Sequence, residues 1–92
     1  MKIWLVGLRN GDATDIHHVC LSENTAMLRW DETRKELRTE RIERMEYAAT
    51  MGYDWLVTMY KRQVDNLAET DPKKLHNYPH DEPFISEMET EY

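Results

Sequence analysis

The chain has 92 residues, 40% of them hydrophobic, and its 18 acidic and 12 basic side chains give a net charge of −6. This length is typical of one domain with a modest core, and the acidity argues against general binding to nucleic-acid phosphates, which requires a basic surface. A single cysteine excludes an internal disulfide framework and fits a reducing compartment. Because no apolar run reaches the roughly 20 residues of a membrane span and the N-terminus lacks a signal-peptide pattern, we expect a cytoplasmic protein without membrane contact.

Two strands are predicted within residues 2–21. Residues 2–8 are apolar on both faces, which is typical of a central strand or of a strand covered on both sides. Turn-forming residues follow at positions 10–12, and residues 16–21 form a second short apolar segment. A hairpin is the simplest connection, and we expect its loop to take about seven residues, 9–15, which is longer than the tight two-residue type.

The stretch 22–70 predicts helix almost throughout. Ser22 is a suitable N-cap, and no Gly or Pro interrupts the strong helix formers between it and Thr50. Gly52 indicates a left-handed end of this helix, and Asp54 is expected to cap a second helix. One continuous helix through Gly52 is the alternative, because the apolar residues keep the same helical spacing on both sides of Gly52.

All three prolines lie in residues 71–83, which predicts an irregular, extended connector. Residues 84–91 alternate between apolar or small side chains and mostly acidic ones, which favours a third strand at a sheet edge, with a short terminal helix as the alternative. We therefore predict a single α/β domain of the α+β type over residues 1–92, in which a small antiparallel three-stranded sheet packs against a long helix and a second, shorter helix.

Four segments of the chain carry a resemblance: residues 2–6, 11–12, 19–26 and 84–91. They supply a short N-terminal strand, a Gly-Asp loop, a second strand that runs into a Ser-Glu helix start, and an acidic closing strand. In this order they resemble small phage-encoded ββα…β proteins of unknown function. The long helical region departs from the shortest members of that pattern. The resemblance implies a phage origin and supplies no catalytic residues.

Histidine and thiolate are zinc ligands, and side chains that could surround a metal lie in two groups: His17, His18 and Cys20, and His76, His80, Asp81 and Glu82. Adjacent histidines in a strand point to opposite faces, and Pro79 disfavours a continuous helix between His76 and His80. A mid-strand cysteine such as Cys20 is more typical of packing than of a nucleophile. We therefore predict no metal site, no cofactor and no catalytic residue.

The predicted first helix is long relative to any sheet that this chain can form. Residues 23–50 would span about 42 Å as helix, whereas a seven-residue strand covers only about 23 Å. The far end of the helix therefore needs cover from the second helix or from another chain, and we predict a homodimer formed mainly around residues 45–55. Because Trp and Tyr are favoured interface anchors, the candidate interface comprises Trp30, Met45, Tyr47, Met51, Tyr53 and Trp55. Packing of the helices against each other within one chain is the alternative.

The second part of the chain is the more acidic, since residues 54–92 contain 9 acidic and 4 basic side chains. The candidate acidic face comprises Asp81, Glu82, Glu87, Glu89 and Glu91. Two functions are compatible with such a face: binding to a basic partner protein and mimicry of nucleic acid. The simpler explanation is that the acidic residues only keep the protein soluble.

The leading functional interpretation is a non-enzymatic protein-interaction module, phage-encoded, that binds and modulates a host or phage protein in the host cytoplasm. Direct binding to nucleic acid is not expected. The alternative is an acidic nucleic-acid mimic that inhibits a DNA- or RNA-handling enzyme. A small metal- or cysteine-dependent enzyme is the least favoured interpretation.

Overall fold

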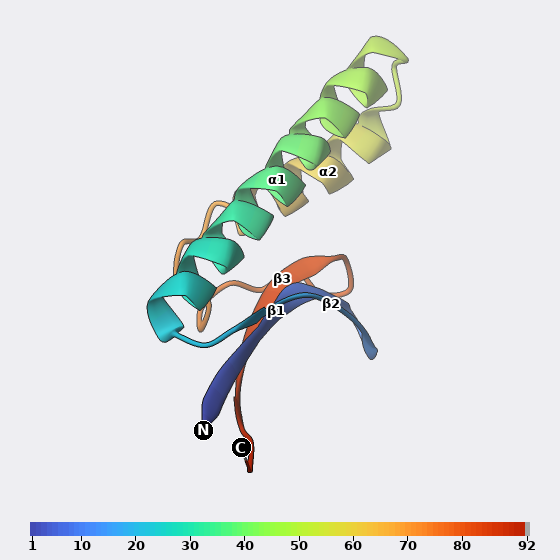
Figure 1. Ribbon diagram of the computed structural model, residues 1–92. Coiled ribbons are helices and arrows are strands. Elements are labelled where there is room, and N and C mark those ends of the chain that lie inside the picture. The colour runs from blue at the N-terminus through green and yellow to red at the C-terminus, as the bar shows by residue number, and fades with distance from the viewer. Residues whose placement is uncertain (92) are drawn as a thin grey trace.

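The computed structural model describes residues 1–91 and contains three strands and two helices (Figure 1). The elements in chain order are β1 (Lys2–Asn10), β2 (Ala13–Cys20), α1 (Glu23–Thr50), α2 (Asp54–Asn66) and β3 (Glu82–Glu89). The strands form one antiparallel sheet in the order β2-β1-β3. The predicted α+β fold is therefore confirmed, with the most apolar strand, β1, at its centre.

The β1–β2 hairpin is tighter than the sequence predicted. Pairing continues to Asn10 and Ala13, so only Gly11 and Asp12 form the loop. The φ angle of Gly11 is +57°, which a glycine at the first position of a two-residue hairpin loop adopts without steric cost. The expectation of a seven-residue loop was wrong because strand pairing rests on backbone hydrogen bonds and continues through polar residues.

A bulge interrupts the pairing of β1 with β2 between Val6 and Gly7. Val6 pairs with His18 and Gly7 with Ile16, which leaves His17 as the extra residue. At Gly7 a side chain would collide with the facing strand, because an added Cβ atom would lie 1.9 Å from the carbonyl oxygen of Asp15. The close approach of the two backbones therefore requires glycine at this position.

The core lies between α1 and one face of the sheet. Side chains alternate along a strand, and Trp4, Val6 and Leu8 of β1 all belong to the side that packs against the core. The buried members of this cluster are Val6, Cys20, Ala26, Trp30, Leu37, Leu67 and Leu75. α1, the C-cap residue of α2 and the connector thus contribute to one core cluster.

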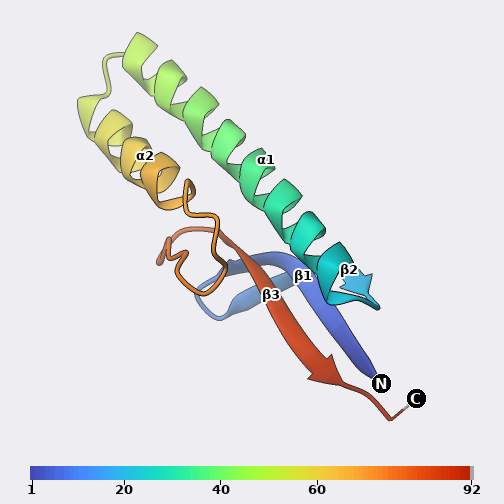
Figure 2. The same ribbon diagram turned by 90° about the vertical axis from the view of Figure 1, so that its left-hand side faces the viewer.

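The helices form an antiparallel pair that extends beyond the sheet (Figures 1 and 2). Ser22 caps α1 as predicted, since its hydroxyl oxygen accepts a hydrogen bond from the Thr25 amide at 3.2 Å. Gly52 has a φ of +75° and separates α1 from α2, so the predicted break is confirmed. The predicted cap at Asp54 was wrong, because Asp54 lies in the first turn of α2 and the N-cap is Tyr53.

The overhang of the helical pair makes the molecule elongated, with extents of 54 × 23 × 20 Å. The sheet-proximal end of α2 is well covered, since Val64 and Leu67 are buried. Leu56 and Met59, nearer to the α1–α2 turn, are only half-buried, although the pattern of α2 predicts them as core residues. The core therefore thins toward the distal end of the helical pair.

The connector between α2 and β3 spans residues 67–81, so it begins and ends earlier along the chain than the predicted connector over 71–83. β3 begins at Glu82 and ends at Glu89, whereas the sequence predicted a strand over residues 84–91. Pro83 lies at the second position of this edge strand, where its missing N–H disrupts little pairing. Neither helix has the combination of length and apolar character that a membrane span requires.

Candidate functional site

Four large side chains with apolar surface remain exposed at the distal end of the helical pair, and we call this surface the helical tip. They come from the last turn of α1, the α1–α2 turn and the first turn of α2. Their exposed fractions are 66% for Tyr47, 48% for Met51, 46% for Tyr53 and 70% for Trp55. All four belong to the interface predicted from the sequence, so the structure brings them together at one end of the molecule.

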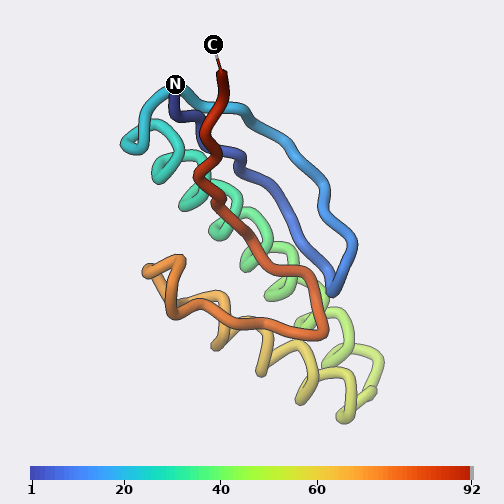
Figure 3. The backbone as a smooth tube through the Cα atoms, turned by 90° about the horizontal axis from the view of Figure 1, so that it is seen from below, coloured from blue at the N-terminus to red at the C-terminus, as the bar shows by residue number. Residues whose placement is uncertain are grey.

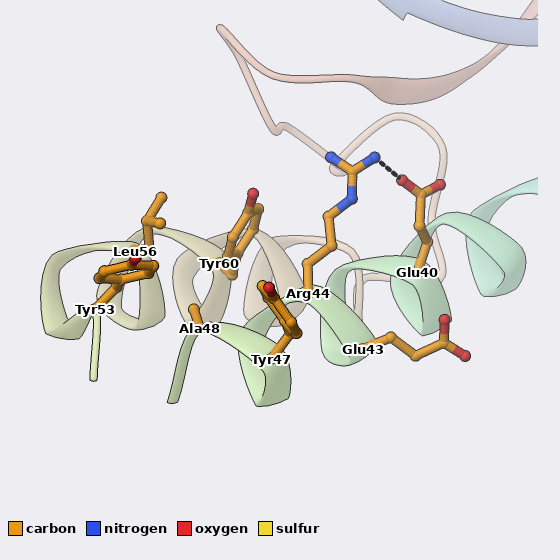
Figure 4. A pocket seen from close by; sticks show the side chains of 8 residues that line it. All are labelled: Glu40, Glu43, Arg44, Tyr47, Ala48, Tyr53, Leu56 and Tyr60. Atoms are coloured by element: carbon orange, nitrogen blue, oxygen red, sulfur yellow. Dashed lines mark ion pairs between the residues drawn. The ribbon is translucent and has the colours of Figure 1, made fainter. Parts of the chain in front are cut away.

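Beside the helical tip, α1 and α2 enclose a groove of about 490 Å³ (Figure 4). Its lining residues are Glu40, Glu43, Arg44, Tyr47, Ala48, Tyr53, Leu56 and Tyr60. Tyr47 approaches the groove from α1, Tyr60 from α2 and Tyr53 from the turn between them (Figure 4). Three tyrosines thus provide large, rigid contact area with polar hydroxyl ends, a combination that is common in protein-binding surfaces.

The charged residues of the groove are unevenly paired. Arg44 forms an ion pair with Glu40 at 2.6 Å, drawn as a dashed line in Figure 4. Within residues 1–91, Glu43, Glu46 and Asp54 take part in no ion pair. The C-terminal end of α1, which carries the negative end of the helix dipole, has no basic residue in its last turn. The surroundings of the helical tip therefore favour a positively charged ligand.

Two residues of the predicted interface lie elsewhere. Trp30 is only 1% exposed and belongs to the core between α1 and the sheet, so its assignment to an exposed interface was wrong. Its spacing along the helix suits a core position as well as an interface position, and only the location of the sheet distinguishes the two. Met45 is half-buried on α1 and contributes little to the exposed surface.

The predicted acidic face is largely neutralised by local partners. Glu87 forms an ion pair with Lys2 at 3.1 Å, and the hydrogen bond between them raises the pKa of Lys2. Glu89 pairs with the N-terminal ammonium group at 3.1 Å. Glu91 is exposed beyond the end of β3. The carboxylates of β3 thus pair with neighbouring cations across the sheet and form no continuous row of unpaired charge.

Asp81 and Glu82, at the start of β3, are structural residues. Glu82 is buried, binds Arg9 at 2.8 Å and accepts a hydrogen bond from the backbone amide of Asn77 at 2.8 Å. Asp81 accepts hydrogen bonds from Arg41 at 3.0 Å and from Asn10 at 2.8 Å. The assignment of Glu82 to an exposed acidic face was therefore wrong, since its carboxylate fixes the connector against β1.

Arginines of α1 hold the C-terminal end of α2. Arg34 donates to the carbonyl oxygen of Leu67 at 2.9 Å, and Arg38 donates to that of Val64 at 3.2 Å. Such carbonyls at a helix end have no partner within their own helix and carry the negative end of its dipole. These bonds fix the angle at which α2 lies on α1, and thereby the position of the helical tip.

A third arginine of α1, Arg41, connects the helices to the sheet. It is buried, and it donates to Gln63 of α2 at 2.8 Å and to Asp81 before β3 at 3.0 Å. This role was not predicted, because the acidic residues that alternate with the arginines along α1 are typical of a solvent-exposed face. The signal was present in the spacing: Arg34, Arg38 and Arg41 recur at helical intervals on one side of α1.

Asp31, one turn before Arg34 on α1, interacts with the positive charges of both Arg34 and Lys35. Asp31 accepts hydrogen bonds from Lys35 at 2.9 Å and from Arg34 at 2.8 Å. These two interactions, with Lys35 contributing most, lower the pKa of Asp31 below its usual value. The carboxylate therefore stays ionised and orients the guanidinium group of Arg34 toward α2.

Cys20 and two of the histidines have local partners in the structure. Cys20 is buried in the core. His17 bonds to Asp15 at 3.0 Å on the β1–β2 hairpin, and His76 stacks on Tyr78 in the connector with ring centroids 6.2 Å apart. Across residues 1–91, no group of three or more His, Cys, Asp or Glu side chains is placed to hold a metal ion.

No protein-family model, curated protein or solved structure matches this chain.

Proposed function

We propose that this protein is a non-enzymatic interaction module that binds another protein through the helical tip and the adjoining groove. The phage origin implied by the resemblance, and a host or phage protein in the host cytoplasm as the partner, belong to the same proposal. Binding at the tip would modulate the partner by occupying part of its surface.

The observation that carries this proposal is the exposure of aromatic side chains at a place where the fold does not need them. Tyr47 and Trp55 are among the most exposed large side chains of the chain, and neither belongs to the core cluster. Aromatic anchors beside a preformed groove are typical of interface hot spots. The arginine contacts from α1 hold the opposite, C-terminal end of α2, so the angle between the two helices is fixed before a partner binds and little order must be gained.

The charges favour a partner segment with basic and apolar side chains. Residues 43–55 contain three acidic side chains and one basic side chain, Arg44, which Glu40 already neutralises. Glu43 lies at the edge of the groove, within reach of a lysine or arginine from a partner whose apolar side chains contact the tyrosines. A mimic of nucleic acid gains less support, because the carboxylates at and near β3 are largely paired within the chain.

Affinity capture with matched variants tests the proposal. Wild type, Tyr47→Ala, Trp55→Ala and Leu28→Ala are immobilised in parallel, and retained host and phage proteins are quantified by mass spectrometry. Leu28 is the control, because it is 67% exposed on α1 and far along the helix from the tip. We expect one partner that wild type and Leu28→Ala retain equally, that both tip variants lose at least tenfold, and that added salt releases.

Retention of the same proteins by all four forms would contradict a role for the tip. Loss with Leu28→Ala as well as with the tip variants would indicate a binding surface spread along α1. Retention that is insensitive to salt would contradict the basic character assigned to the partner.

A further inference from the structure

The sheet has a second face, on the side away from the helices. Because Trp4, Val6 and Leu8 of β1 point to the core and side chains alternate along a strand, Ile3 and Leu5 point the other way. Side chains of directly paired residues share a face, and Leu5 pairs with Val19 while Ile3 pairs with Met88. The apolar side chains of this face, which we call the outer sheet face, are Ile3, Leu5, Ile16, Val19, Phe84 and Met88.

The outer sheet face is apolar, and it is exposed except at Phe84, which is buried, and at Ile3 and Leu5, which are half-buried. The exposed fractions of Ile16, Val19 and Met88 are 49%, 62% and 49%. In the view from this side, the three strands lie in front of α1, and no other segment of residues 1–91 crosses in front of them (Figure 3). A half-covered sheet normally carries polar side chains on its free face, so an apolar free face indicates a binding surface.

The outer sheet face is also nearly free of net charge. Its charged strand residues are the exposed Arg9 and the buried Glu82, which are directly paired across the two strands and bind each other at 2.8 Å. The carboxylates of Glu87 and Glu89 belong to the opposite face, because they pair with Trp4 and Lys2. A chain with a net charge of −6 thus presents one surface on which a like-charged molecule meets no repulsion.

We infer that the outer sheet face binds a second copy of this chain and forms a two-fold dimer. Twisted antiparallel sheets pack face to face with interdigitated apolar side chains, so such a face is complementary to itself. A charged partner would find no opposite charge here, whereas an identical copy needs none. The dimer predicted around residues 45–55 is thereby placed on the sheet instead, because two copies joined at the tip would bring together Glu43, Glu46 and Asp54 of each.

The size of the face is compatible with a dimer of modest affinity. Strands of eight or nine residues at about 3.3 Å per residue and about 4.8 Å apart form a surface of roughly 26 × 14 Å. Each surface thus has a projected area of about 360 Å², so two of them bury roughly 700 Å² before the relief of the side chains is counted, which is near the low end of interface sizes and typical of weak association. We therefore expect association in the micromolar range and not an obligate dimer.

This dimer leaves the proposed binding surface free. In this dimer the two sheets lie face to face in the middle and the helices of each copy lie on the outside, since the helices cover only the opposite side of each sheet (Figures 1 and 3). Both helical tips then remain exposed, and a partner with repeated binding segments would gain avidity from the pair. The inference does not depend on the proposed function, because it concerns a different surface of the molecule.

Light scattering across a concentration series tests the inference with four forms: wild type, Val19→Lys, Leu28→Lys and Tyr53→Glu. Val19→Lys adds a charge to the outer sheet face, and Leu28→Lys adds the same charge to an exposed position on α1. We expect wild type, Leu28→Lys and Tyr53→Glu to reach twice the chain mass of 11.1 kDa at high micromolar concentration. Val19→Lys should stay at the mass of one chain, because dimerisation would bury its ammonium group without a partner.

Circular dichroism must show that each variant is folded, and Met88→Lys on β3 replaces Val19→Lys if the latter is not. A wild-type mass of one chain at every concentration would overturn the inference. So would a dimer that survives both sheet-face variants. Dissociation by Tyr53→Glu but not by Val19→Lys would place the interface at the helical tip and overturn the assignment to the sheet.

Discussion

Gly7 shows how a single residue controls the geometry of the sheet. The bulge at His17 brings the backbone of β2 so close to β1 that only a residue without a side chain fits. The sequence identifies Gly7 as an unusual residue in an apolar strand, but the register of pairing is needed to see why. Bulges depend on a long-range match of two strands, which local propensities do not contain.

Replacement of Gly7 by alanine should destabilise the protein by about 1–3 kcal/mol, because the added methyl group meets backbone atoms that cannot rotate away. Urea unfolding followed by circular dichroism measures this change. Thr14→Ala, on the exposed end of β2, is the control and should change the free energy of unfolding by less than about 0.5 kcal/mol. An equal effect of the two substitutions would contradict the close approach at Gly7.

Asp31 gives the stability of α1 a dependence on pH. Its pKa is lowered in the folded state by Lys35 and Arg34, so the folded state gains stability from the ionised form above the unfolded pKa. That gain is lost as the pH falls through the folded pKa. Wild type should therefore exceed Asp31→Asn in stability near neutral pH, by less than about 1 kcal/mol because the pair is partly exposed.

Urea unfolding from about pH 6 to about pH 2 tests this dependence, since the two curves should converge only at the acidic end. Glu36→Gln removes an exposed carboxylate of α1 that forms no ion pair within residues 1–91 and serves as the control. A constant difference between wild type and Asp31→Asn over the whole range would contradict the lowered pKa.

At the scale of elements, the limits of the helices follow from short sequence signals. Ser22 and Gly52 act through their own backbone conformation and hydrogen bonds, which are local and therefore predictable. The way in which α2 lies on α1 is different. It depends on Arg34, Arg38 and Arg41, whose partners are 22 to 40 residues away along the chain. Alternating charges along a helix are typical of a solvent-exposed face, so the local pattern does not indicate these long-range partners.

The two ends of α2 should differ in their contribution to stability. Leu67 is fully buried in the core, so Leu67→Ala should cost about 2–5 kcal/mol. Leu56 is half-buried beside the groove, so Leu56→Ala should cost less than half as much as Leu67→Ala. Urea unfolding of both variants measures these losses in the free energy of unfolding. Equal losses would show that the distal end of α2 is packed more tightly than in this structure.

At the scale of the whole molecule, the chain leaves apolar surface uncovered in two places, the helical tip and the outer sheet face. The exposed tip was predictable in part, because a long helix must extend beyond a short sheet. The outer sheet face was not, since the two apolar faces of residues 2–8 fit a strand covered on both sides equally well. Only the arrangement of both helices on one side of the sheet shows that the other side is free.

Site-specific photo-crosslinking tests most directly whether the helical tip binds a partner. A photoreactive amino acid replaces Trp55 in one form of the protein and Leu28 in another, and each is irradiated in the cells in which the protein acts. We expect one discrete crosslinked product from position 55 and none from position 28, although the two side chains are similarly exposed. Equal crosslinking from both positions, or a product from position 28 alone, would contradict the helical tip as the binding surface.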